Sequence, residues 1–166
     1  MIEFDWDQRE LAALPIPTDI HETDIDELRR NWFRVWIRGR VNGKDLFAKR
    51  HVNSGLAPRV HVQLLDFALT FAGTIEDVVK SGKATLDPWE YGAFIELTLA
   101  GNSIVVYSKS TNITDRVEVV SAVSSVRILN DSVRAILLGL SPHFVTHPQL
   151  GRWARGEFES INYESL

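Results

Sequence analysis

The sequence predicts an α+β fold: a mostly antiparallel sheet made of two hairpins and additional strands, with two main helices packed on one face. Two alternating or apolar runs are each closed by a two-residue turn, Asn42-Gly43 and Gly101-Asn102. Turns this short allow only antiparallel neighbours. Two further segments, within residues 60–82 and 124–140, carry apolar residues at helical spacing, and these helices are expected to cover the sheet.

Composition predicts one globular domain over residues 1–166. The chain has 45% hydrophobic and 24% charged residues, values typical of neither disordered nor membrane-spanning chains. It has no cysteine, which removes disulfides, zinc-cysteine sites and thiol catalysis together. The first residues, MIEFDWDQREL, are acidic and lack the apolar run of a signal peptide. We therefore expect a cytoplasmic protein that does not contact a membrane.

The N-terminal segment predicts a strand followed by a short helix. Ile2, Phe4 and Trp6 alternate with acidic residues, which is typical of a half-buried strand. After a proline-containing extended stretch, the acidic residues up to Glu27 predict a helix that opens at Thr23 or Asp24.

The clearest local prediction is a hairpin within NWFRVWIRGRVNGKDLFAKR, residues 31–50. Asn42-Gly43 suits a type I′ turn because both residues tolerate positive φ. A two-residue turn fixes the register: Arg40 opposite Asp45, Gly39 opposite Leu46, Arg38 opposite Phe47, Ile37 opposite Ala48 and Trp36 opposite Lys49. An ion pair at Arg40/Asp45 and a cation–π contact at Trp36/Lys49 are expected.

This hairpin has two faces of different character. The expected core face holds Phe33, Val35, Ile37, Leu46 and Ala48. The opposite face, here called the Trp/Arg face, holds Trp32, Arg34, Trp36, Arg38, Arg40, Phe47, Lys49 and His51. Trp, Phe and Arg are enriched at binding hot spots, so we predict a partner-binding site at Trp32, Arg34, Trp36, Arg38, Arg40 and Phe47.

The sequence after the first hairpin predicts two helices, a second hairpin and a further strand. A helix is expected from Val60, either continuous or interrupted at Gly73-Thr74, and ending at Gly82. Asp87-Pro88-Trp89-Glu90 predicts one helical turn. The Gly101-Asn102 hairpin pairs Leu99 with Ile104, Leu97 with Val106 and Glu96 with Tyr107. Residues 116–123 predict a further strand, and the last helix is expected to begin near Ser124 or Ser125.

Charge is distributed in blocks along the chain. Residues 1–28 carry nine acidic residues against one basic residue, whereas residues 29–59 carry nine basic residues against one acidic residue. Such blocks can form a basic binding surface or can neutralise each other within the fold. The second interpretation places the acidic segment over the Trp/Arg face, with arginines paired to Asp19, Glu22, Asp24, Asp26 and Glu27.

Catalytic and cofactor motifs are missing from the sequence. No G-x-S-x-G, G-x-G-x-x-G or Walker pattern occurs, so we predict no enzyme activity and no cofactor. His143 and His147 have the spacing of two ligands on one helical turn, but Pro142 and Pro148 flank them and no HExxH glutamate is present. We expect solvent-facing or capping histidines there rather than a metal site.

Protein and nucleic acid are the two partner classes to weigh. Arginines could bind phosphates and tryptophans could stack on bases. However, the whole chain has a pI near 5.7, and a nucleic-acid domain normally has an unopposed basic face. A protein partner is therefore the main expectation, a nucleic-acid or small-molecule ligand of the Trp/Arg face is the alternative, and the oligomeric state is left open.

The hairpin segments VNGKDLF (41–47) and DPWEYGAFIELTLAGNSIVVYS (87–108), in an acidic chain without cysteine, give the sequence a recognisable layout. This layout resembles the small cytosolic α+β immunity proteins of bacterial polymorphic-toxin systems. The resemblance implies a non-enzymatic protein that binds a toxin and blocks its active surface. It rests on layout and transfers no individual functional residue.

Overall fold

Two four-stranded antiparallel sheets form the β part of the protein. A computed structural model describes residues 1–7, 10–11, 13–47, 59–87 and 94–157. Sheet A contains β1 (Ile2–Trp6), β2 (Arg34–Val41), β3 (Lys44–Asp45) and β4 (Val60–Gln63). Sheet B contains β5 (Lys83–Leu86), β6 (Ile95–Ala100), β7 (Ser103–Ser108) and β8 (Ile113–Glu118). The predicted α+β class is confirmed, with the strands divided between two sheets.

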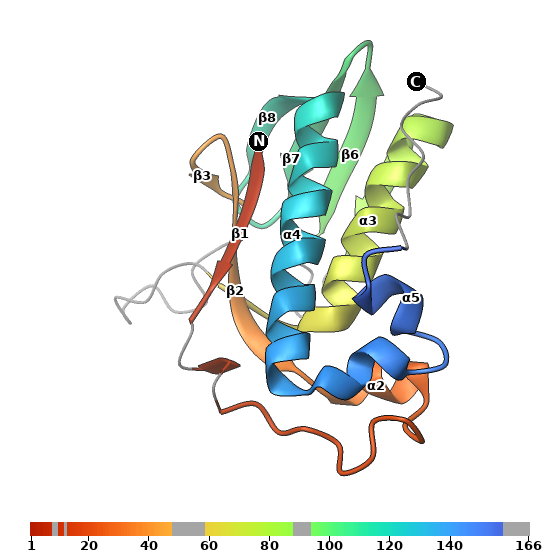
Figure 1. Cartoon of the computed structure of the whole chain (residues 1–166). Coiled ribbons are helices and arrows are strands. Elements are labelled where there is room, and N and C mark those ends of the chain that lie inside the picture. Colours follow the sequence, from red (N-terminus) through yellow and green to blue (C-terminus); the bar gives the residue numbers. More distant parts are fainter. Residues whose placement is uncertain (8–9, 12, 48–58, 88–93, 158–166) are drawn as a thin grey trace, which may run out of the picture.

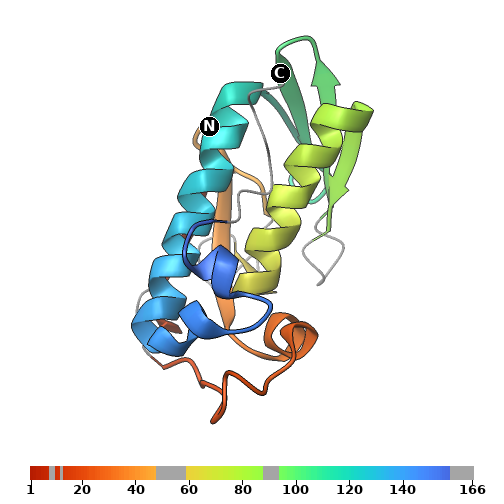
Figure 2. The same ribbon diagram turned by 45° about the vertical axis from the view of Figure 1, so that its right-hand side comes forward.

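Two long helices lie side by side along one side of these sheets (Figures 1 and 2). They are α3 (Leu64–Ser81), which connects sheet A to sheet B, and α4 (Val119–Leu140), which returns from sheet B and crosses beside β1. The shorter helical elements are α2 (Ile25–Asn31), the 3₁₀ helix η1 (Pro142–Thr146) and α5 (Gly151–Ala154). Asp24 caps α2 through a 2.7 Å bond to the Asp26 N–H, as the acidic run predicts.

The strand β2 is the centre of sheet A. The strand β1 pairs with its second half along one edge, in the register Ile2↔Val41 to Trp6↔Ile37. Two strands pair with the other edge of β2: β3 next to the turn, and β4 along residues Arg34 to Ile37. The predicted partners of Trp36 and Ile37 were therefore wrong: His61 and Val60 of β4 take those places.

The hairpin departs from the predicted pairing because of Gly39, where β2 has no side chain. The ring of Phe47 fills this space and is only 2% exposed. Leu46 still donates to the Gly39 carbonyl at 2.8 Å, as the predicted register requires. The chain then turns inward at Phe47, so the returning arm of the hairpin is short. Ala48, Lys49 and His51 lie outside the described residues.

The boundary between strand and helix also differs from the prediction at two places. Residues 60–63 alternate between buried and half-buried and join sheet A, so α3 begins at Leu64 and runs uninterrupted past Gly73 and Thr74. Residues 119–123 belong to α4 rather than to a strand, because Ala122 and Val126 share its buried side. The Gly101-Asn102 hairpin has the predicted register. The strand β5 was missed, and the predicted turn at 88–90 lies outside the described residues.

Side chains join the two sheets near the Asn42-Gly43 turn. The hydroxyls of Ser108 and Ser110 donate to the Leu46 carbonyl. The Asn42 amide donates to the Asp115 carboxylate at 3.0 Å and to the Arg116 carbonyl at 2.9 Å. These bonds fix the tip of the first hairpin against β7 and β8, and so fix the orientation of β2, which carries the Trp/Arg face.

Candidate functional site

The Trp/Arg face is the outer surface of β2. Along this strand Val35, Ile37, Gly39 and Val41 are buried, whereas Arg34, Trp36, Arg38 and Arg40 are half-buried or exposed. Because side chains of a strand alternate, these four residues point away from the core that the helices cover. Four of the six predicted site residues therefore share one surface.

Two of the arginines on this surface are held by carboxylates. Arg38 makes a two-pronged contact with Asp45, at 2.6 Å from Nε and 3.1 Å from Nη2. This hydrogen bond raises the pKa of Arg38 further above its ordinary value. Arg40 pairs with Asp5 of β1. The register places Arg40 opposite Asp45 as predicted, but Asp45 reaches diagonally to Arg38 instead.

Trp36 and Arg34 complete the surface. The Trp36 indole stacks on the His61 ring of β4, with centroids 4.9 Å apart and an angle of 27° between the planes. The backbone N–H of Trp36 donates to the Glu10 carboxylate at 3.0 Å, beyond the end of β1. Arg34 is exposed, and its guanidinium contacts no acid within the described part of the chain. Among the described residues, Arg34 therefore presents an unpaired positive charge beside a fixed aromatic stack.

Two predicted site residues lie elsewhere. Trp32 is the C-cap of α2, and the positive φ of 60° at Phe33 breaks the alternation between it and β2. It packs against the hydrophobic core, and its indole N–H is buried without an acceptor among the described residues. Phe47 is buried against Gly39 and is not available to a partner. No local pattern in the sequence indicates either displacement.

The acidic N-terminal block neutralises part of this surface, but through other residues than predicted. Asp5 and Glu10 contact β2. In contrast, Asp19 accepts from the backbone of His21 and Glu22, and Asp24 caps α2. No ion pair joins the predicted acids at 19–27 to the arginines of β2 in the described residues. The Trp/Arg face is thus charge-compensated along its edge with β1 without being covered by the 19–27 segment.

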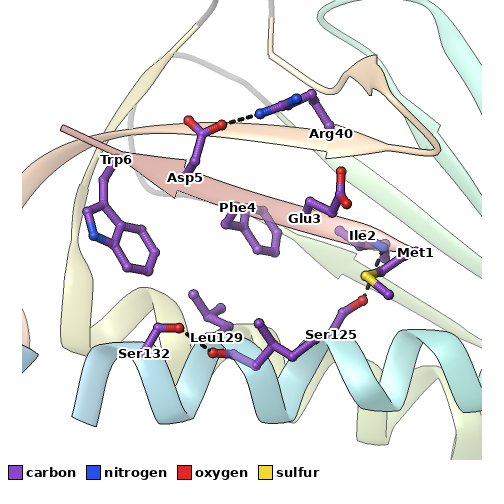
Figure 3. A pocket seen from close by; sticks show the side chains of 11 residues that line it. Met1, Ile2, Glu3, Phe4, Asp5, Trp6, Arg40, Ser125, Leu129 and Ser132 are labelled. Carbon is purple, nitrogen blue, oxygen red and sulfur yellow. Dashed lines mark hydrogen bonds and ion pairs between the residues drawn. The ribbon is translucent and has the colours of Figure 1, made fainter. Parts of the chain in front are cut away.

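A groove that the sequence analysis missed lies between β1 and α4 (Figure 3). It has a volume of about 410 Å³. Figure 3 shows β1 as one wall and α4 as the other, with Phe4 and Trp6 pointing toward the helix. The residues that line it are Met1, Ile2, Glu3, Phe4, Asp5, Trp6, Arg40, Ser125, Ile128, Leu129 and Ser132. The volume falls within the range of small ligand sites.

Of the histidines at 143 and 147, His143 is exposed, whereas His147 serves the structure. His147 is 3% exposed, and its Nδ1 accepts from the backbone N–H groups of Gln149 and Leu150. Its Nε2 lies 2.9 Å from the Thr23 carbonyl and donates to it, which assigns the proton to Nε2. Both ring nitrogens are thereby used. Within the described residues, no group of three or more His, Asp or Glu side chains is arranged to hold a metal ion.

Comparison of the chain with protein-family models, with curated proteins and with solved structures found no match. Among the described residues, no helix has both the length and the apolar character needed to cross a membrane.

Proposed function

We propose that this chain is a protein-binding domain without catalytic activity of its own, and that the Trp/Arg face is its contact surface. The observation that carries this proposal is the fixed arrangement on β2, where Trp36 is stacked on His61 while Arg38 and Arg40 are held by carboxylates. Side chains that are already ordered lose less entropy when a partner binds. Arg34, whose charge has no acidic partner in the part of the chain that the structure describes, can pair with an acidic group of that partner.

Charge compensation favours protein over nucleic acid as the partner. A nucleic-acid surface needs free cations to replace the counterions of the phosphates. Two of the three arginines on β2 already pair with Asp45 and Asp5. A protein interface tolerates such internal pairs, because hot spots rely on aromatic and arginine side chains in fixed positions.

The resemblance to immunity proteins suggests which kind of protein the partner is. We propose that the partner is a bacterial toxin domain and that the chain blocks its active surface in the cytoplasm of the cell that makes both. An acidic patch on the toxin would match Arg34.

Affinity capture with matched variants tests the contact surface. Arg34→Glu and Arg34→Glu/Trp36→Ala should each reduce retention of the partner by at least about tenfold. The glutamate repels the acidic group of the partner, and Trp36→Ala also removes an aromatic contact. Arg116→Glu is the control, since Arg116 is exposed on β8 in the other sheet. Equal capture by all variants would remove the Trp/Arg face as the contact surface.

Two further measurements separate the alternatives. Retention on single-stranded DNA that falls steeply with salt, and that Arg34→Ala abolishes, would favour the nucleic-acid function. For the immunity function, co-expression with a toxin encoded next to this chain should restore growth. Growth that stays inhibited while the complex does not form would reject the immunity function and leave other protein partners open.

A further inference from the structure

Among the described residues, no strand pairs with the outer edge of β1. Asn42 donates to the Met1 carbonyl, so the odd-numbered residues of β1 point their backbone groups toward β2. The even-numbered residues then point theirs outward. The Ile2 N–H confirms this direction, since it donates to Ser125 Oγ of α4 at 3.0 Å. The outward N–H and C=O groups of Phe4 have no partner among the described residues.

An open edge normally carries a cost, because it offers unpaired groups to other chains. Here the edge borders the groove between β1 and α4 (Figure 3). Apolar side chains line both walls of this groove: Phe4 on β1, and Leu129 and Ile128 on α4, of which Ile128 is 55% exposed. An added strand could therefore pair with β1 and place alternate side chains against apolar atoms of α4.

The other face of β1 carries Glu3 and Asp5, on the same side of sheet A as Arg40 and Arg38, their partners in the register. Glu3 is exposed and contacts no cation among the described residues, while Asp5 is paired with Arg40 and its side chain is 45% exposed. The added strand would place its remaining side chains beside these carboxylates. A second copy of β1 would bring acids against acids in an antiparallel arrangement, which is destabilising. Basic side chains at alternate positions match Glu3 and Asp5 instead, because β1 lies between the added strand and the arginines of β2.

We propose that the edge of β1 and the groove beside it bind an extended segment of a partner protein in which apolar and basic residues alternate. The apolar side chains occupy the groove against Ile128 and Leu129, and the basic side chains lie beside Glu3 and Asp5. Glu3 and Asp5 border the Trp/Arg face, but the backbone edge of β1 and the groove lie away from Arg34 and Trp36, so this site does not require those two residues to form an interface.

A capped heptapeptide of alternating arginine and valine is the probe. It should bind with a Kd on the order of 100 μM, and amide exchange of Phe4 measured by NMR should slow by at least about tenfold on binding. A peptide of the same composition, with arginines and valines in separate blocks, should bind at least about fivefold more weakly. Unchanged Phe4 exchange at saturating peptide, or equal binding of both peptides, would overturn the proposal.

Backbone methylation tests strand pairing itself. Phe4 and the valine opposite it would form the hydrogen-bonded pair of an antiparallel ladder, so methyl groups on the valine nitrogens should abolish antiparallel binding. Methyl groups on the arginine nitrogens should abolish parallel binding instead. Loss of binding in one of these two peptides supports the pairing and gives its direction. Retention in both would contradict it.

Surface variants locate the site. Ile128→Glu should weaken peptide binding about tenfold, whereas Val120→Glu on the same helix should change it less than twofold, because Val120 is 74% exposed and lies outside the groove. Glu3→Lys should weaken the arginine peptide about fivefold and strengthen a glutamate–valine peptide. Arg34→Glu should leave the affinity unchanged. Equal effects of Ile128→Glu and Val120→Glu would reject the groove as the binding site. A molecular mass that rises with protein concentration would show that two copies of the chain associate through β1, and would contradict the argument that their acidic residues repel each other.

Discussion

The missing side chain at position 39 shapes the surface of β2 more than any charged residue does. A Cβ at Gly39 would lie 2.7 Å from the Phe47 ring and 3.1 Å from the Phe4 ring. Both rings pack against the core, so neither can move aside freely. This contact turns the chain inward after Leu46 and leaves Phe47 buried.

Substitution at Gly39 provides a stability test at the residue scale. Gly39→Ala should lower the free energy of unfolding by about 1–3 kcal/mol, because the added methyl group overpacks the space between Phe4 and Phe47. Urea denaturation followed by fluorescence measures this change. Gly73→Ala is the control: nothing lies within 4 Å of its Cβ position inside α3, and the variant should be stabilised by about 0.5–1 kcal/mol. A neutral Gly39→Ala would show that the rings move without cost.

At the scale of elements, most strands and helices could be predicted because their signals are local. The turns at Asn42-Gly43 and Gly101-Asn102 fixed the pairing next to each turn, and Asp24 marked the start of α2. The first turn of α4 was assigned to a strand because Val119, Val120 and Val123 have high β propensity. Burial of Ala122 and Val126 against the rest of the core overrides that preference.

The first turn of α4 also predicts a stabilising substitution. It contains no acidic residue, and Val120 is 74% exposed there. Val120→Asp should raise the free energy of unfolding by about 0.3–1 kcal/mol, because a carboxylate interacts favourably with the helix N-terminus. Thermal unfolding measures the effect, with Val120→Lys expected to shift the Tm in the opposite direction. Destabilisation by Asp and not by Lys would contradict a helix that begins at Val119.

Less of the candidate site than of the fold could be predicted. The alternation along β2 correctly grouped Arg34, Trp36, Arg38 and Arg40. The groove beside α4 was not predictable, because it needs the pairing of β1 with β2 and the passage of α4 along β1, both of which join residues far apart in sequence. Neither the left-handed Phe33 nor the inward turn at Phe47 has a local sequence signal.

At the scale of the whole molecule, Asp115 joins the two sheets. Its carboxylate accepts from Lys44 at 2.8 Å, from the Arg116 N–H and from Asn42. The hydrogen bond from Lys44, followed by that from Arg116, lowers the pKa of Asp115 to about 2. The stabilisation is therefore present above the ordinary aspartate pKa of about 3.9 and is lost as the pH falls toward 2.

Asp115→Asn tests this connection. At pH 7 the variant should be less stable than the wild type by about 1–2 kcal/mol, and at pH 3 the difference should shrink by about half, since the unfolded wild type is then largely protonated. Urea unfolding at both pH values measures the two differences. Glu96→Gln, an exposed change in sheet B, should change stability little at either pH. A difference that does not depend on pH would show that the Asp115 carboxylate is not specifically stabilised by folding.

The most direct test of the protein-binding function is photo-crosslinking from single positions on the two sheets. A photoreactive phenylalanine analogue at position 34 lies on the Trp/Arg face, and the same group at position 116 lies on β8 of sheet B. Irradiation in cells that contain the natural partner should give one discrete protein adduct from position 34, and no comparable adduct from position 116. No protein adduct from position 34, or equal adducts from both positions, would contradict the Trp/Arg face as the surface that binds a protein.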